Sequence, residues 1–244
     1  KFGSRVATGG DVNGDGYDDV LIAAWYYEGI ISPSNQGAVF GYFGSASGVD
    51  GTADWSDFGT QTDEYFGASI ALAGDVNGDG YSDVLVGTGQ YTNGQAQEGG
   101  AFLYYGSSTG LPSSPSVTYE SNQADAYLGD CVATAGDVNG DGYADLLLAA
   151  QNYDNGQSDE GQVWVYYGSP DGPATTAVWS KDGDEALAGC GWSAATAGDV
   201  NGDGRSDILV GIPFFDNGAG GNPNPGRAQV YLALADDYAS AATF

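Results

Sequence analysis

The sequence contains no histidine and no methionine, two cysteines, and only five lysine or arginine residues against 33 acidic ones. Histidine is the side chain most often used for acid–base catalysis, and no serine or cysteine lies in a nucleophile motif such as G-x-S-x-G. The formal charge of −28 disfavours nucleic acid and anionic membranes, because clustered lysine and arginine bind phosphate groups. No apolar run reaches the roughly 18 residues that a membrane helix needs. The sequence therefore predicts a chain that is not an enzyme and binds cations, basic partners or neutral ligands such as glycans.

Acidic residues are concentrated in a nine-residue segment, DVNGDGYDD, that begins at Asp11 and recurs three times with small changes. The first aspartates of the copies, Asp11, Asp75, Asp137 and Asp199, are 64, 62 and 62 residues apart. A lone Asn-Gly or Asp-Gly segment is usually a solvated turn between strands, and such a turn needs only its glycine. Four copies that keep Asp, Asn, Asp and Asp at the same positions favour a ligand-binding loop.

Each copy has oxygen side chains at positions 1, 3, 5 and 9, and glycines at positions 4 and 6 that permit a sharp bend. Ca²⁺ prefers roughly six to eight oxygen ligands and accepts carboxylates, amides and the backbone carbonyl expected from position 7. An EF-hand would need a glutamate at position 12 on a helix, but position 12 is Ile22, Val86, Leu148 or Val210. We predict four Ca²⁺ sites, with these ligands: Asp11, Asn13, Asp15, Tyr17, Asp19, Asp75, Asn77, Asp79, Tyr81, Asp83, Asp137, Asn139, Asp141, Tyr143, Asp145, Asp199, Asn201, Asp203, Arg205 and Asp207.

The residues around the acidic loops repeat with the same period. Short apolar runs such as VLIAA and LLLAA follow each loop and predict buried strands. A third, aromatic strand is predicted at 37–44, 99–106, 161–168 and 226–233, and a weaker fourth strand around Trp55, Tyr119, Trp179 and Phe244. Four antiparallel strands without helical periodicity form one blade of an all-β propeller. The predicted blades, in one array, are about 1–61, 62–123, 124–185 and 186–244.

The FG…GD start of each unit, the DVNGDGYxD loop and the aromatic third strand resemble FG-GAP repeats, the blades of the integrin α-subunit β-propeller and of many bacterial surface proteins. The resemblance spans the chain, although Leu128 and Cys190 replace the phenylalanine of FG in the third and fourth units. It implies a seven-bladed ring with Ca²⁺ in the loops between first and second strands. It also implies that ligands dock on the opposite rim.

That opposite rim carries the candidate ligand-binding residues Trp25, Tyr26, Tyr27, Tyr91, Tyr153, Phe214 and Phe215. Packing between hairpin tips is the alternative role of these rings. Our prediction is a non-catalytic, calcium-binding scaffold for extracellular adhesion or protein interaction. The alternative is an integrin-like lectin, because aromatic rings beside Glu28, Asp154 and Asp216 also suit a pyranose. A glycosidase that uses Asp or Glu also stays open, although the regularly spaced acids are assigned to metal.

Calcium sites of low affinity are filled outside cells, so we expect a secreted or cell-surface protein. Neither a signal peptide nor a methionine is present, so we also expect a mature or excised product. Cys131 and Cys190 lie near the first strands of neighbouring units. A disulfide between them and two free thiols both stay open, and a bridge would close a loop of about 60 residues, worth ~4 kcal/mol.

Closure of the ring is the remaining question. A seven-bladed ring turns by about 51° per blade, whereas a four-bladed ring needs about 90°. An open array leaves its two end sheets without partners. The chain is therefore a fragment of a longer chain, a compressed four-bladed ring, or half of an eight-bladed ring of two chains. We predict the last, a homodimer.

Overall fold

The computed structural model describes residues 1–29, 34–216, 225–234 and 238–244. In these residues sixteen strands form four antiparallel sheets. The sheets are β1 (Arg5–Gly10), β2 (Asp19–Ala23), β3 (Ala38–Tyr42) and β4 (Trp55–Phe58); β5 (Ser69–Gly74), β6 (Asp83–Thr88), β7 (Gly100–Tyr104) and β8 (Val117–Glu120); β9 (Leu128–Gly136), β10 (Asp145–Ala150), β11 (Gln162–Tyr166) and β12 (Trp179–Asp182); and β13 (Ser193–Gly198), β14 (Asp207–Ile212), β15 (Arg227–Ala233) and β16 (Tyr238–Thr243). No helix occurs in the described ranges, and thus none that could cross a membrane. The all-β prediction with four blades is confirmed.

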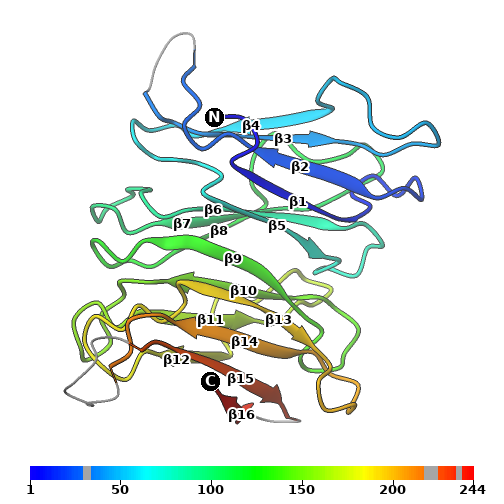
Figure 1. The fold of residues 1–244 in the computed structure, drawn as a ribbon. Coiled ribbons are helices and arrows are strands. Elements are labelled where there is room, and N and C mark those ends of the chain that lie inside the picture. Colours follow the sequence, from blue (N-terminus) through cyan, green and yellow to red (C-terminus); the bar gives the residue numbers. More distant parts are fainter. Residues whose placement is uncertain (30–33, 217–224, 235–237) are drawn as a thin grey trace.

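The sheets are stacked in chain order, and within each sheet every strand pairs with the next one along the chain (Figure 1). The acidic loops lie at one end of every sheet, on the right in Figure 1, and the connections between second and third strands lie at the other end. The pairing register of the first two strands of each sheet shifts immediately before the acidic loop. The pairing of β1 with β2 shifts after Thr8, so that Gly10 faces Asp19, and the same shift places Gly74 opposite Asp83.

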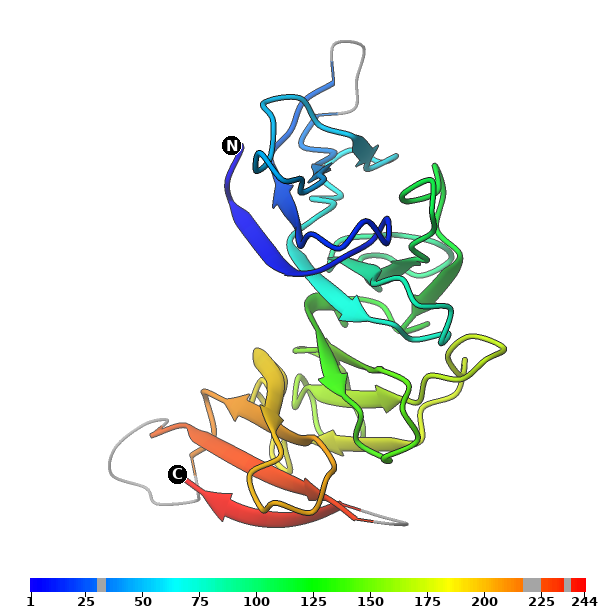
Figure 2. The same cartoon turned by 90° about the vertical axis from the view of Figure 1, so that its right-hand side faces the viewer.

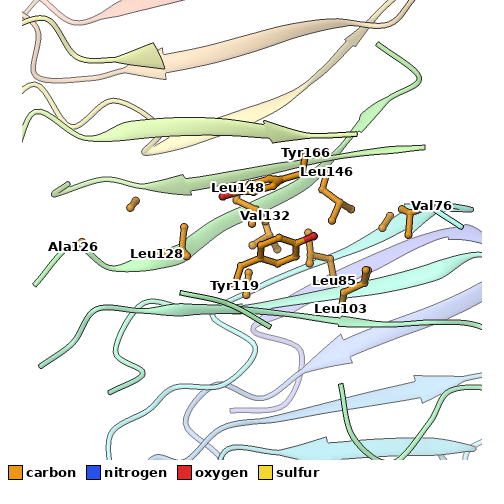
Figure 3. Close-up of a cluster of buried hydrophobic side chains, with 13 residues drawn as sticks. Val76, Leu85, Leu103, Tyr119, Ala126, Leu128, Val132, Leu146, Leu148 and Tyr166 are labelled. Carbon is orange, nitrogen blue, oxygen red and sulfur yellow. The ribbon is translucent and has the colours of Figure 1, made fainter. Parts of the chain in front are cut away.

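Neighbouring sheets pack face to face through alternating residues of their second strands. Side chains of strands point to opposite faces in turn, so Leu85 of β6 faces the third sheet while Val86 faces the first. Figure 3 shows the cluster between the second and third sheets, where Leu85 and Leu103 meet Leu146 and Leu148. Aromatic pairs close these interfaces at the outer strands, as in Tyr119 and Tyr166 with ring centroids 4.7 Å apart. Leu128 and Cys190, at the phenylalanine position of FG, are both buried in these clusters.

The array is an open arc (Figure 2). The inner strands pack in series, β1 on β5, β5 on β9 and β9 on β13, but the first and last sheets do not pack face to face. Exposure of equivalent residues shows this directly. Leu209 of the last sheet is 38% exposed, whereas its counterparts Leu21, Leu85 and Leu147 are at most 1% exposed. The structure is therefore not the compressed four-bladed ring.

The expected position of the last aromatic residue is corrected by the structure. Phe244 does not take the place of Trp179: it lies beyond β16, is 77% exposed, and its backbone pairs with Ala228. The pairing of β15 with β16 shifts between Val230 and Tyr231, so Tyr238 packs against Trp179 instead, with centroids 4.8 Å apart. The sequence gives no sign of this shift.

The cysteines are free, so the possible disulfide is not formed. The Cys131 sulfur accepts the N–H of Ala194 at 3.2 Å, on the neighbouring inner strand. The Cys190 thiol instead donates to the carbonyl of Lys181 at 3.5 Å, in the core between the third and fourth sheets. The two residues stand at different positions of their units, which points the thiols at different neighbours.

Candidate functional site

The four acidic loops share one hydrogen-bonding pattern, which is described here for the loop between β1 and β2. Asp11, at position 1, accepts the N–H of Gly14 at 2.6 Å on Oδ1 and the N–H of Gly16 at 2.8 Å on Oδ2. Asn13 Oδ1 accepts the N–H of Asp15 at 3.0 Å. The equivalent bonds occur in the other three loops. Backbone amides therefore hold the polar side chains of positions 1 and 3 inside each loop.

The aspartate at position 9 anchors the loop to the sheet. Asp19 accepts the N–H of Val12 at 2.8 Å on Oδ2 and the N–H of Gly44 at 2.7 Å on Oδ1. Its counterparts Asp83, Asp145 and Asp207 make the same two bonds, at 2.8 to 2.9 Å. All four side chains are at most 1% exposed. Position 9 thus joins the acidic loop to the segment that follows the third strand.

Three of the position-9 carboxylates carry charge at an energetic cost. Burial raises the pKa of Asp83 and of Asp145 to about 7 and also raises the pKa of Asp19. Backbone N–H donors lower these values, and the aspartates at positions 1 and 5 of the same loop raise them further by charge repulsion. In the described part of the chain all ion pairs involve Lys181 or Arg227, and none involves an acidic loop.

The donor chemistry of the loops fits Ca²⁺. Every loop offers three carboxylates, one side-chain amide oxygen and backbone carbonyls, which are the hard ligands that this ion prefers. Oδ2 of the position-1 aspartate accepts a single N–H in each loop and keeps a lone pair for an ion. Among the described residues no three acidic, cysteine or histidine side chains already surround one point. An ion would therefore need the side chains of positions 1, 3 and 5 to turn toward it.

Neighbouring acidic loops are bonded to each other along the array. The N–H of Ser82, at position 8 of the second loop, donates to the carbonyl of Asp11 at 2.8 Å, and Ser82 Oγ accepts the N–H of Asp11 at 3.2 Å. The backbone bond recurs from Ala144 to Asp75 at 2.9 Å and from Ser206 to Asp137 at 2.8 Å. These hydrogen bonds therefore couple the conformation of one loop to that of the loop in the next blade.

Side chains at position 7 reinforce this link, a role that the sequence analysis missed because it assigned only their carbonyls. The ring of Tyr81 covers Gly14 of the preceding loop so closely that a Cβ there would lie 2.5 Å from Cε1. Tyr143 covers Gly78 in the same way. Tyr17, in the first of the four loops, is 43% exposed. The recurrence of tyrosine at this position is the signal that was available in the sequence.

The candidate rim aromatics do not form one site. Trp25 and Tyr26 pack together at 4.9 Å, and Trp25 lines a pocket of about 230 Å³ with Arg5, Asp130 and Trp192. Phe214 packs on the other side of Trp192, at 5.4 Å.

The other rim aromatics lie between blades or on their own sheet. Tyr27 packs on Phe58 of its own sheet at 5.5 Å, and Tyr91 and Tyr153 line crevices between blades. Phe215 lies under the guanidinium of Arg227, 3.9 Å from the ring centroid. Packing is thus the observed role of several of these rings, and Trp192 is a rim residue that the sequence analysis did not select.

Four meander sheets stacked in an arc, with an acidic loop after each inner strand, define the class: an open β-propeller with repeated oxygen-rich loops. The FG-GAP repeat family matches at residues 2–42, 66–104, 132–166 and 191–231, more than half of the chain. The chain belongs to this family.

Curated relatives include two kinds of larger protein. Phosphatidylinositol-glycan-specific phospholipase D of Mus musculus is 32% identical over 160 residues, 61% of this chain and 18% of that protein. Integrin alpha-4 of Xenopus laevis is 31% identical over 166 residues, 65% of this chain and 15% of that protein. Integrin alpha pat-2 of Caenorhabditis briggsae is 29% identical over 237 residues, 89% of this chain and 18% of that protein. The chain thus spans less than a fifth of the length of these relatives.

Proposed function

We propose that this chain is a non-catalytic propeller scaffold for extracellular adhesion or protein interaction, with one structural Ca²⁺ in each acidic loop. The position-9 aspartate is the observation that carries this proposal. It is a buried carboxylate with acidic neighbours in the same loop, and burial raises its pKa in Asp19, Asp83 and Asp145. Among the described residues no lysine or arginine forms an ion pair with it. A divalent cation bound by positions 1, 3, 5, 7 and 9 would remove that repulsion.

Calcium would stabilise the array as well as each loop. The position-1 aspartate is a ligand in the proposal, and its carbonyl accepts a hydrogen bond from the next loop. An ion that orders one loop therefore strengthens the contact with the following blade. Binding to the folded state alone adds ~2.7 kcal/mol per site at a hundredfold excess over Kd.

The first prediction is that removal of calcium lowers the melting temperature sharply. Thermal unfolding is followed in excess Ca²⁺ and in EDTA, and bound calcium is counted by equilibrium dialysis. Asp79→Ala removes the position-5 ligand of the second loop and should reduce the count by one. The control Asp18→Ser alters an acid at position 8, where Ser82 and Ser206 stand in other loops, and should leave the count unchanged. An identical melt in EDTA and calcium would contradict the structural role.

The non-catalytic role is supported by the burial of the two cysteine thiols, the strongest potential nucleophiles of the chain. Burial raises the pKa of the Cys190 thiol to about 12 and raises that of Cys131 as well. Both sulfurs are bonded to backbone groups. The phospholipase D relatives are enzymes by name, but this chain corresponds to under a fifth of their length. We propose that the shared part acts as a scaffold.

A second candidate function, glycan binding, is favoured by the pocket beside Trp192. This indole is 54% exposed and lines two pockets, of about 230 and 300 Å³. Arg5, Asp130 and Gln151 line the first pocket, so hydrogen-bonding groups stand beside an open aromatic face. A glycan array with the wild type and Trp192→Ala tests this candidate: no bound glycan, or equal binding by both proteins, would reject it.

A further inference from the structure

Two of the three blade interfaces contain corresponding crevices between the outer strand of one sheet and the third strand of the next. The crevice between the first and second sheets has a volume of about 250 Å³ and includes Asp57, Glu64, Tyr91 and Phe102 in its lining. The crevice between the second and third sheets measures about 120 Å³. Trp164 stands there at the register position of Phe102. Glu120 and Tyr166 also line a neighbouring hollow of about 290 Å³ at this interface. The first crevice is therefore distinguished by its two acids and not by its volume.

The corresponding place between the third and fourth sheets is occupied by the chain's own cations. Arg227 pairs with Ile212 as Gly100 pairs with Thr88, so the arginine stands where the second sheet has no side chain. Its guanidinium lies over the ring of Phe215, 3.9 Å from the centroid, and forms an ion pair with Asp184 at 3.1 Å.

The aromatic ring of the first crevice corresponds to the ring of this filled site, whereas its acid Asp57 corresponds to a cation of that site. Phe215 and Tyr91 are both the sixteenth residue after the first aspartate of their units. Lys181 stands at the register position of Asp57. A guanidinium therefore fits this place in the fold when an aromatic ring and an acid are provided.

In the first crevice neither acid forms an ion pair with a lysine or arginine of the described residues. Glu64 is 2% exposed, and its Oε2 accepts the N–H of Thr60 at 2.6 Å and of Gln61 at 2.7 Å. Asp57 Oδ2 accepts the hydroxyl of Tyr104 at 2.7 Å. No lysine or arginine is among the lining residues of this crevice. Burial raises the pKa of Glu64, and the charge of Asp57 raises it further.

We propose that the crevice between the first and second sheets binds an organic cation, namely a guanidinium or alkylammonium group such as the end of an arginine or lysine side chain. The cation lies against the rings of Tyr91 and Phe102 and pairs with Asp57 and Glu64, as Arg227 lies against Phe215 and pairs with Asp184 in the filled site. Cations are attracted to aromatic faces, and guanidinium combines this stacking with bidentate pairing to carboxylates. This site is independent of the acidic loops.

The test uses small probes on the calcium-saturated protein at physiological salt. Isothermal titration with N-acetylarginine amide, N-acetyllysine amide and N-acetylcitrulline amide compares two cations with a neutral isostere of arginine. One saturable site is expected for a cationic probe, with binding of the citrulline probe at least tenfold weaker. The better of the two cations identifies the group that the crevice prefers. Equal binding of citrulline would overturn the proposal.

Variants distinguish the crevice from the general attraction of a chain with charge −28. Asp57→Asn keeps an acceptor for the Tyr104 hydroxyl and should weaken the cationic probe at least tenfold. Gly100→Arg places an internal cation where Arg227 stands and should abolish binding; the added Cβ meets only side chains, at 3.2 Å. Asp50→Asn removes an exposed acid and should leave affinity unchanged. Equal loss in Asp50→Asn and Asp57→Asn, or full binding by Gly100→Arg with a native melt, would refute the site.

Discussion

Single residues of this chain tune its response to pH, and Asp130 on β9 is the clearest case outside the acidic loops. Burial raises its pKa to about 6, although Gln151 Nε2 donates to it at 2.7 Å and the charge of Arg5 favours the ionised form. An unfolded chain would protonate this carboxyl near its ordinary value of 3.8. The folded state therefore binds the proton more tightly between pH 4 and 6. Its contribution to stability is present below that range and is lost as pH rises through it.

Asp130→Asn should remove this pH dependence. We expect the stability of the variant relative to wild type to rise by about 2 kcal/mol between pH 4 and pH 7, because two pKa units correspond to roughly 2.7 kcal/mol before solvent screening. Any constant cost of the amide cancels in this difference. Urea unfolding of both proteins in saturating calcium over this range provides the measurement. A difference that stays flat, or that falls with pH, would show that the carboxyl is not perturbed.

At the level of elements, the sequence predicted strand type and order because each unit carries strong local signals. The segment from Asp83 to Thr88 is buried throughout and is a strand in the structure. The acidic loop ahead of it is held by N–H groups of the loop that donate to the side chain of Asp75. Contacts between units leave no such signal. The aromatic ring of Tyr81 on Gly14 and the shifted pairing of β15 with β16 depend on which residues meet in space. The predicted position of Phe244 in the last strand was wrong for this reason.

The contact between successive loops can be tested with glycines that differ only in their neighbours. Gly14, Gly78 and Gly202 all stand at position 4 with φ of +72°, +74° and +77°. Alanine there carries a backbone cost of about 1 kcal/mol at each site. A Cβ at Gly14 or Gly78 also meets a tyrosine ring at 2.5 or 2.3 Å, whereas nothing lies within 4 Å of one at Gly202.

We therefore expect Gly14→Ala and Gly78→Ala to destabilise the protein by about 1 to 2 kcal/mol more than Gly202→Ala, since overpacking adds to backbone strain. Chemical denaturation in saturating calcium measures the three variants. Equal losses would mean that the tyrosines move aside without cost and that the loops are not mechanically linked.

On the scale of the whole molecule, the two end faces of the arc are complementary. Inside the array the row containing Leu147 packs against the row containing Ile208 and Val210. The last sheet exposes Leu209, which is equivalent to Leu147. The first sheet partly exposes Val20 and Ile22, which are equivalent to Ile208 and Val210. Burial of a leucine side chain contributes about 1.5 to 3 kcal/mol. We propose that a second copy covers both faces, so that two arcs form one ring of eight blades.

Light scattering on the calcium-saturated chain should then give twice 24.9 kDa. Leu209→Asp should return the mass to that of a single chain, because a charge at the centre of the end face would be buried without a partner. Val49→Asp is the matched control: Val49 is 50% exposed and stands in the loop between β3 and β4, away from the stacked faces. Its mass should equal that of the wild type. A wild-type mass of 24.9 kDa at every protein concentration measured would exclude the second copy. Further blades of a longer chain would then be the alternative cover for these faces.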